Sequence, residues 1–525
     1  MALPKLAHEA LKGIVGPECI TDDCAACQAY LRGGEGVGMW DKDRVPPGVV
    51  VLPQNTEQVQ GIIRVANRYG LPYVPISTFM IAFCSPSRPN TIMIDPKRMN
   101  HMEIDAKNQT AIVEPYVTFA NLQAEAFKYG LYTSTPLCGS QASVLANHIA
   151  WGLGQPAHRV GYGSRRILGM EWVLPDGELL RTGSLTVPGA GPFWGEGPGP
   201  DLRGLVRAQM GHLGGMGFVT RIGVKLFAMP SCQPERQGVS PYTTFSLPGD
   251  RFRWYVIFYT TVDQCVEALY KIGQAEIGMA VMRVPALWHT LRRTISKRDF
   301  WERWSKEIEE VRKNKTNIVR VACCGFASAK QVEYEERVLQ DIAAETGSVL
   351  TRVKQTSAGD MFQNGVAPCA YKPTGAFMSQ KLSFESIDHC QKQVRASISL
   401  KYALQPDLLI EDAEEAGWIM SYDFGHLCHS EETTYFDNTE EDNDRAVQHE
   451  LETIKFDVDT HSWVGWQVGW SHTLLGPDMC NYHQLVEKAR HTFDPNWVSN
   501  PPRAYISPEE KKKDTRTYPY RPGSS

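Results

Sequence analysis

Residues 45–230 alternate short runs of β-branched residues with amphipathic helical patterns that stop on glycine. Residues 49–53, Val-Val-Val-Leu-Pro, have the composition of a strand. Asn55 is a typical helix N-cap residue, and apolar residues then recur at helical spacing until Gly70 can supply a left-handed stop. Such a succession of strand, helix and strand predicts helices that pack on a sheet.

The same pattern continues along the chain and then changes near residue 230. Further short strands are expected at residues 71–75, 91–94 and 111–113, and a second helix at about residues 118–129. Beyond residue 230 the sequence predicts an aromatic strand at 252–258 and amphipathic helices at 263–278 and 330–346. The fold class expected from these segments is α+β.

Length and charge limit the class of protein. A chain of 525 residues is too long for one hydrophobic core, so more than one domain is expected. The net charge of −5 excludes a global field that would attract nucleic acid or an anionic membrane. No window approaches the ~18 to 20 apolar residues that span a bilayer. A cytoplasmic location is therefore expected. The acidic runs at residues 411–415 and 439–444 are predicted to be solvated loops or helix ends.

The thirteen cysteines are expected to be reduced thiols, because the N-terminus lacks the apolar core of a signal peptide. Cys19, Cys24 and Cys27 have the spacing of a 2Fe–2S loop, but the next cysteine, Cys84, is too distant in sequence to be its fourth ligand. Incidental thiols are the favoured interpretation of this cluster.

Common catalytic and nucleotide-binding motifs are missing from the sequence. It contains no Walker A, HExxH, GxSxG or paired CxxC motif. Residues 211–217, Gly-His-Leu-Gly-Gly-Met-Gly, are rich in glycine but do not form GxGxxG. They also precede an expected strand rather than a helix, which disfavours a Rossmann pyrophosphate site.

A larger set of segments resembles one known family. Residues 49–73, 91–117, 140–147, 169–183 and 214–220 are similar, in order and spacing, to the FAD-binding domain of the vanillyl-alcohol oxidase and p-cresol methylhydroxylase family. Residues 493–501 resemble the family's closing segment. The resemblance implies a two-subdomain FAD-binding domain of the p-cresol methylhydroxylase type at residues 1–230, completed by residues 490–525. Residues 231–489 would form an α+β cap (substrate) domain with an antiparallel sheet.

The family resemblance also implies which residues bind the cofactor. In the family, backbone N–H groups of tight loops hold the FAD pyrophosphate, and small residues permit its close approach. The matching positions here are Ser77, Thr78, Phe79, Pro136, Gly139, Ser140, Ala142, Ser143, Asn147, Gly161, Gly217, Val219 and Asn500. No resident metal is expected.

The chain departs from the family pattern at three places. The first phosphate loop, residues 75–90, has no glycine, although Arg88 is available as a charged donor. The loop could follow a different path, bind FAD more weakly, or have lost the cofactor. Trp470 and Ser471 replace the tyrosine–arginine pair that binds a phenolate in the family, and Ser164 replaces an acidic residue near the flavin. A para-phenol substrate is therefore not expected.

The cap contributes the candidate catalytic residues, His426, His429, Glu431, Trp470 and His472. The resemblance places the histidine that bonds covalently to flavin in some members at His429 or Ser430. A metal site made of His426, His429 and Glu431 is an alternative, although a regular strand presents only His429 and Glu431 on one face. Cys138 is a further candidate for a flavin tether.

The function implied by the resemblance is FAD-dependent hydride transfer from a small, aromatic or apolar organic substrate to the flavin, as an oxidase or a dehydrogenase. O2 or an electron-acceptor protein would reoxidise the cofactor, and a homodimer is expected. One alternative is a flavin-dependent 2-hydroxy-acid dehydrogenase, which needs a cationic carboxylate site. Another is a non-redox cyclase or binding protein on the same fold.

Overall fold

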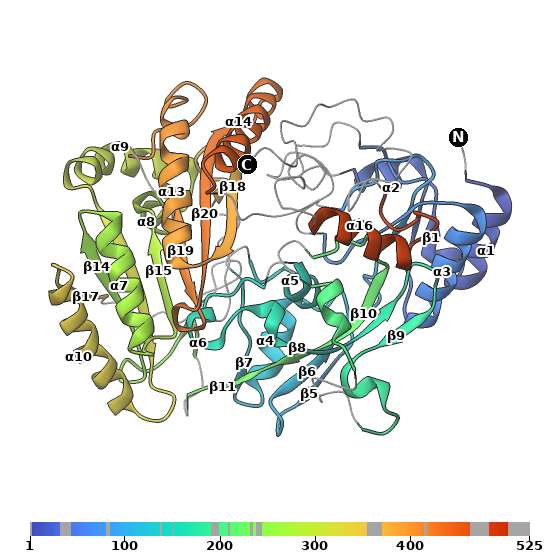
Figure 1. Ribbon diagram of the computed structural model, residues 1–525, viewed down its shortest axis with the longest axis horizontal. Helices are drawn as coiled ribbons and strands as arrows, with labels where there is room; N and C mark the ends of the chain where they lie inside the picture. The colour runs from blue at the N-terminus through green and yellow to red at the C-terminus, as the bar shows by residue number, and fades with distance from the viewer. Residues whose placement is uncertain are drawn as a thin grey trace.

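Two parts of the molecule lie side by side in the computed structural model (Figure 1). The N-terminal part, blue to teal, contains the described residues up to 230, and the cap, green to orange, contains the described residues from 244 to 462. The structure describes residues 3–31, 44–79, 84–136, 139–150, 152–190, 199–207, 211–230, 235–237, 244–353, 370–413, 417–462 and 482–501.

The first sheet of the N-terminal part has four strands in the order β1 (Ile20–Thr21), β2 (Val49–Val51), β4 (Ile92–Ile94) and β3 (Tyr73–Pro75). β2 and β3 run parallel to β4, and helices α1 (Lys5–Val15) and α3 (Thr56–Tyr69) contribute to its core. The predicted start and end of α3 are confirmed. The Asn55 side chain accepts a hydrogen bond from the Gln58 N–H at 2.9 Å, and Gly70 adopts φ 62°.

The second sheet is antiparallel and has five strands in the order β5 (Met102–Asp105), β6 (Thr110–Val113), β10 (Phe218–Lys225), β8 (Ile167–Val173) and β9 (Leu179–Arg181). Helices α4 (Phe119–Phe127) and α5 (Val144–Ala150) share its apolar core. A small pair, β7 (Leu131–Tyr132) and β11 (Phe227–Ala228), follows at one end. The C-terminal helix α16 (Tyr482–Phe493), red in Figure 1, returns to this part of the molecule, and Val486 and Phe493 pack on the same core.

The cap contains a seven-stranded sheet. Its order is β17 (Leu350–Arg352), β14 (Phe252–Tyr259), β16 (Asn317–Cys324), β15 (Ala280–Val284), β19 (Trp418–Tyr422), β20 (Leu427–Asp437) and β18 (Gly375–Glu385), and all pairs are antiparallel. Together the two parts confirm the predicted α+β fold with an antiparallel cap sheet. The predicted domain boundaries remain predictions.

The two faces of the cap sheet have different neighbours. One face, with Val281, Ile419 and Cys428, packs against α7 (Val262–Gln274), α10 (Ala329–Glu345) and α13 (Ile387–Tyr402). On the opposite face, Met420 and Tyr422 share a core with Tyr132 and Tyr162 of the N-terminal part. Because side chains alternate along a strand, every second residue of β19 and β20 is directed toward the N-terminal part.

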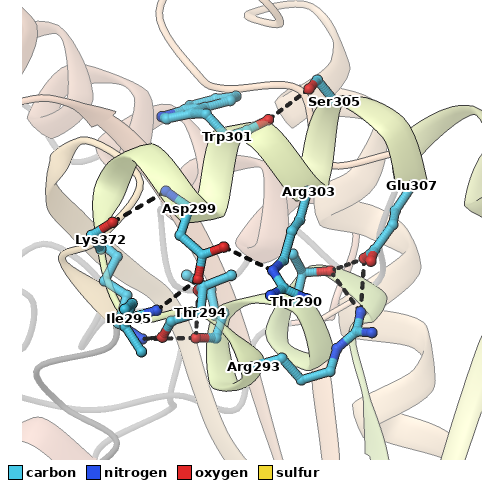
Figure 2. Close-up of polar contacts among 12 residues, drawn as sticks. Thr290, Arg293, Thr294, Ile295, Asp299, Trp301, Arg303, Ser305, Glu307 and Lys372 are labelled. Atoms are coloured by element: carbon cyan, nitrogen blue, oxygen red, sulfur yellow. Dashed lines mark hydrogen bonds and ion pairs between the residues drawn. The ribbon is translucent and has the colours of Figure 1, made fainter.

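Helices α8 (Ala286–Arg293) and α9 (Lys297–Asn314) form a hairpin on this inner face (Figure 2). The Thr290 hydroxyl and the Arg293 guanidinium both donate to the Glu307 carboxylate, at 2.5 and 2.8 Å. The Lys372 ammonium donates to the carbonyl of Leu291 at 2.9 Å and also to that of Thr294. These bonds hold the hairpin so that Trp288 and Trp304 enter the core between cap and N-terminal part.

Short helix α6 (Ala157–Val160) joins the two parts of the molecule. The His158 Nε2–H donates to the Ile277 carbonyl at 3.0 Å, so the neutral ring accepts the Ser421 hydroxyl at Nδ1, 2.9 Å away. Burial lowers the pKa of His158 to about 3, which keeps the ring neutral.

One surface prediction is wrong. Asp412, in the first acidic run, is only 3% exposed and pairs with the buried Lys401 ammonium. The second run is confirmed as a helix end, because it begins α14 (Glu440–Asp459). In the part of the chain that the structure describes, no helix is long and apolar enough to cross a bilayer.

Candidate functional site

The first predicted phosphate loop follows β3. Phe79 adopts φ 52° and Asn90 adopts φ 62°, so non-glycine residues make the left-handed turns that the sequence suggested would be difficult. Ser77 and Thr78 are half-buried, and their N–H groups donate no hydrogen bond to another described residue. The loop therefore keeps backbone donors for an anion despite lacking glycine.

The second predicted loop leads into α5, and two of its polar side chains have structural roles. The Ser143 hydroxyl donates to the Pro115 carbonyl at 2.7 Å and accepts from the Ala146 N–H at 3.1 Å. The Asn147 amide donates to the Leu153 carbonyl at 2.9 Å. Gly139 adopts φ 124°, and Ser140 and Ala142 are buried beside it. Backbone N–H groups and small residues, rather than these two side chains, are what this loop offers a ligand.

The C-terminal segment closes over the first loop. The Ser499 hydroxyl donates to the Gly214 carbonyl at 2.6 Å and accepts from the Gly217 N–H at 2.9 Å. A Cβ at Gly214 would lie 2.4 Å from Pro75 Cγ, so the glycine allows the two backbones to approach. Asn500, at φ 44°, is fully buried, and its Oδ1 has no hydrogen-bond partner among the described residues.

Several other buried polar atoms lack a partner, which is unusual because buried polar groups normally form hydrogen bonds. They include Ser134 Oγ and both amide atoms of Gln155, whose main chains lie next to each other. The loops, the close glycine contacts and these orphaned atoms, Asn500 Oδ1 among them, fit a large polar cofactor such as FAD. Ser77, Thr78, Ser140 and Asn500 belong to these loops, and their contact with the cofactor stays a prediction.

The cap places His429 toward the N-terminal part of the molecule. Its ring is fully buried, with its centroid 6.4 Å from that of Tyr422, and its Nε2 lies 3.4 Å from a Glu431 carboxylate oxygen. Ser430 faces the other way, and its hydroxyl donates to the Gln393 side chain of α13 at 2.7 Å. Strand register therefore favours His429 over Ser430 as the inward-facing residue.

The predicted alternative of a metal site is not supported by the geometry. His426 is exposed just before β20 begins, apart from the buried His429. Among the described residues, no group of three His, Cys, Asp or Glu side chains could hold a metal ion. Cys19 of the predicted thiol cluster instead accepts a hydrogen bond from Arg98 at 2.9 Å.

The remaining predicted residues are distributed as follows. Val219 packs in the core of the second sheet, and its contact with the cofactor stays a prediction. Gly161, at φ 78°, follows α6 next to Asp423 of the cap. The Ser164 hydroxyl donates to the His148 carbonyl at 2.6 Å and is buried. Pro136 is also buried. The predictions for Cys138, Trp470, Ser471 and His472 fall outside the described residues.

Comparison with known proteins agrees with this geometry. Residues 47–183 match an FAD-binding domain family. The 4-cresol dehydrogenase (hydroxylating) flavoprotein subunit of Pseudomonas putida is 31% identical over 33% of this chain and 34% of its own length. The D-lactate dehydrogenase of Archaeoglobus fulgidus is 27% identical over 34% of this chain and 38% of its own. The matched region thus spans little more than a third of either relative.

A solved structure of p-cresol methylhydroxylase with substrate bound superposes on almost the whole chain. Its TM-score is 0.78 at 18% identity, covering 97% of this chain and 99% of that one. The chain therefore has the fold of p-cresol methylhydroxylase. The family match and the flavoprotein relative confirm the predicted FAD-binding domain.

Two inward-facing residues were not predicted from the sequence. His158 joins the two parts of the molecule, and Arg166 is buried at the end of η3 (Gly163–Arg166), directly before β8. The sequence carries no clear signal for Arg166, because it lies in a short 3-10 helix and strand alternation does not apply to it.

Proposed function

We propose that this protein is an FAD-dependent oxidoreductase that removes a hydride from a C–H bond of a small organic substrate held between the cap and the FAD-binding domain. The observation that carries the proposal is His429, a buried histidine on the inner face of the cap sheet with Glu431 3.4 Å away. Bound FAD supplies the hydride acceptor.

The residues of the chain would divide the work between binding and proton transfer. Ser77, Thr78, Ser140 and Asn500 would hold the cofactor through backbone and side-chain groups. His429 would take the proton that the substrate loses at oxygen or nitrogen. Its Nε2–H donates to the Glu431 carboxylate, so Nδ1 is the ring nitrogen that accepts the proton. Glu431 would then stabilise the imidazolium, since an adjacent carboxylate favours the charged ring. Covalent attachment of flavin at His429 is the competing role.

The inner face of the cap suggests the shape of the substrate. Trp288 and Trp418 stack edge to face, with ring centroids 5.1 Å apart, and Met420, Tyr422 and Tyr435 extend the same surface. Aromatic walls of this kind favour a flat or apolar substrate body. We keep a 2-hydroxy-acid dehydrogenase as the second candidate, because a D-lactate dehydrogenase is among the relatives.

Purification tests the proposal directly. A yellow protein whose flavin absorption is bleached by a substrate under anaerobic conditions would support hydride transfer. A colourless protein that takes up no added FAD would contradict it, and so would turnover without any change in flavin colour. Colour that survives acid precipitation in the wild type and is lost in His429→Ala would assign covalent attachment to His429. The electron acceptor, a homodimer and a cytoplasmic location stay predictions.

A further inference from the structure

Arg166 differs from the other deeply buried arginines of the described chain. Arg203, Arg283 and Arg490 are 4%, 1% and 0% exposed, and each donates hydrogen bonds to carbonyl or side-chain oxygens. Arg166 is 3% exposed, yet Nε, Nη1 and Nη2 all lack a hydrogen-bond partner. Its only aromatic contact is the Phe227 ring, whose centroid lies 5.7 Å from the guanidinium carbon.

The groups that interact electrostatically with Arg166 carry no negative charge at neutral pH. They are Tyr132, Tyr422 and His148. Burial raises the pKa of both tyrosines, so their phenols stay protonated, and burial lowers the pKa of His148 to about 3. Burial also lowers the pKa of Arg166 to about 10, which leaves the guanidinium charged at neutral pH. A positive charge is therefore buried here, and no described residue supplies a compensating anion.

Such an arrangement is costly for a folded chain. Burying an ion without a partner costs on the order of several kcal/mol of folding free energy, so buried charges in proteins are normally paired. Residues retained at such a cost are typical of binding sites, where the ligand supplies the missing partner. A guanidinium fork matches the two oxygens of a carboxylate.

The position of Arg166 links it to the proposed chemistry. Tyr422 interacts with Arg166 and also lies beside His429, with 6.4 Å between the two ring centroids. Ser134 follows Tyr132 by two residues and packs against Gly154, which precedes Gln155. Ser134 Oγ and the side-chain amide of Gln155 are also buried and have no hydrogen-bond partner among the described residues. These are neutral donors that could bind the remaining lone pairs of an anionic group.

We propose that Arg166 binds the carboxylate of an anionic substrate and so orients it relative to His429. This inference rests on the proposed function and narrows it, because it makes the substrate an organic acid. Trp470 and Ser471 stand where the family has the tyrosine–arginine pair that binds a phenolate. Arg166 would supply the positive charge that this position lacks.

The test compares carboxylates with matched amides. Wild-type holoprotein, Arg166→Gln and Arg166→Lys are titrated with acetate, benzoate and benzamide, and binding is followed by thermal shift and by perturbation of the flavin spectrum. We expect at least one carboxylate to bind the wild type more tightly than benzamide does. Its Kd should rise about 10- to 100-fold in Arg166→Gln, as expected for lost charged hydrogen bonds. Arg166→Lys should recover part of the affinity, and benzamide binding should not change.

Stability separates this role from a structural one. Arg166→Met should leave Tm unchanged or raise it, because it removes an unpaired buried charge. Arg203→Gln, the matched control, should lower Tm because Arg203 bonds the Ile167 and Leu168 carbonyls.

Three results would overturn the proposal. The first is that wild type and Arg166→Gln bind carboxylates with equal affinity. The second is that the wild type prefers no carboxylate over benzamide. The third is that Arg166→Gln loses FAD but still prefers carboxylates over benzamide. The last result would assign the guanidinium to the cofactor. A colourless protein that still prefers carboxylates would refute the proposed oxidoreductase but not this site.

Discussion

His429 and Ser430 are neighbours in the sequence, but their side chains leave β20 on opposite faces. Ser430 bonds Gln393 of α13, whereas His429 lies beside Tyr422 on the inner face. Sequence similarity alone left both residues as candidates for the same role. The pairing of β20 with β19, which sets Met420 opposite His429, decides between them.

His429→Gln should lower kcat by about 100- to 10,000-fold if His429 is the general base, because an amide cannot accept the substrate proton. Steady-state kinetics with an accepted substrate measure the effect. Ser430→Ala is the control and should change kcat by less than about tenfold, since Ser430 faces α13. Equal losses in the two variants would contradict the assignment.

Ser143 was predicted to contact the cofactor, but its hydroxyl serves the start of α5. It accepts the Ala146 N–H at 3.1 Å, as a helix cap does. Ser143→Ala should therefore reduce the free energy of unfolding by about 0.5 to 2 kcal/mol, measured by urea denaturation. FAD affinity should change less than stability. A large loss of FAD with stability unchanged would restore the predicted cofactor role.

At the scale of elements, α6 connects the two parts of the molecule through a histidine that must stay neutral. The His158 ring donates to Ile277 and accepts from Ser421, so a second ring proton would break the bond to Ser421. Its pKa is lowered by burial to about 3 in the folded chain, whereas the unfolded chain has the ordinary value of about 6.5.

Stability should fall on acidification as a result. Between about pH 6.5 and the folded pKa of about 3, the unfolded state binds the additional proton, so stability rises with pH in this window. Each such histidine contributes up to about 1.4 kcal/mol per pH unit. His158→Gln should reduce the loss of unfolding free energy measured from about pH 6.5 to about pH 5. His101→Gln, at an exposed position, should not. An identical pH dependence in wild type and His158→Gln would refute this.

At the scale of the whole molecule, residues 490–500 fasten the end of the chain to the FAD-binding domain. The Asp494 carboxylate lies 3.3 Å from the Arg490 guanidinium and accepts from the Val498 and Ser499 N–H groups. Arg490 donates in turn to the carbonyls of Gly215 and Ser499. This network positions Asn500 and Gly214 over the first loop, so a distant part of the sequence completes the site.

Asp494→Ala should destabilise the protein by about 3 to 5 kcal/mol, because it leaves the buried Arg490 charge without its partner. Flavin content after purification should fall as well. Asp407→Ala is the control, since Asp407 forms an exposed ion pair with Arg445 and should cost less than about 1 kcal/mol. Thermal unfolding and flavin absorbance measure both effects. Equal stability of the two variants would show that the network does not fasten the chain end.

Local patterns were sufficient for much of the architecture. The Asn55 cap, the Gly70 stop and the strand at 218–225 depend on interactions within a few residues, and each is confirmed. The family resemblance, carried by ordered segments of the same region, led to the FAD-binding domain. The acidic run containing Asp412 misled, because its buried partner, Lys401, is contributed by a separate helix.

The site depended on contacts that no local pattern contains. Arg165 and Arg166 are adjacent and identical in type, and only the packing of distant segments buried Arg166 with no hydrogen-bond partner among the described residues. Ser143 could not be separated from Ser140 by residue type, because the Pro115 carbonyl that binds it comes from another segment. Helices and turns follow from short-range bonds, whereas burial, register and pairing of charges arise only when distant segments meet.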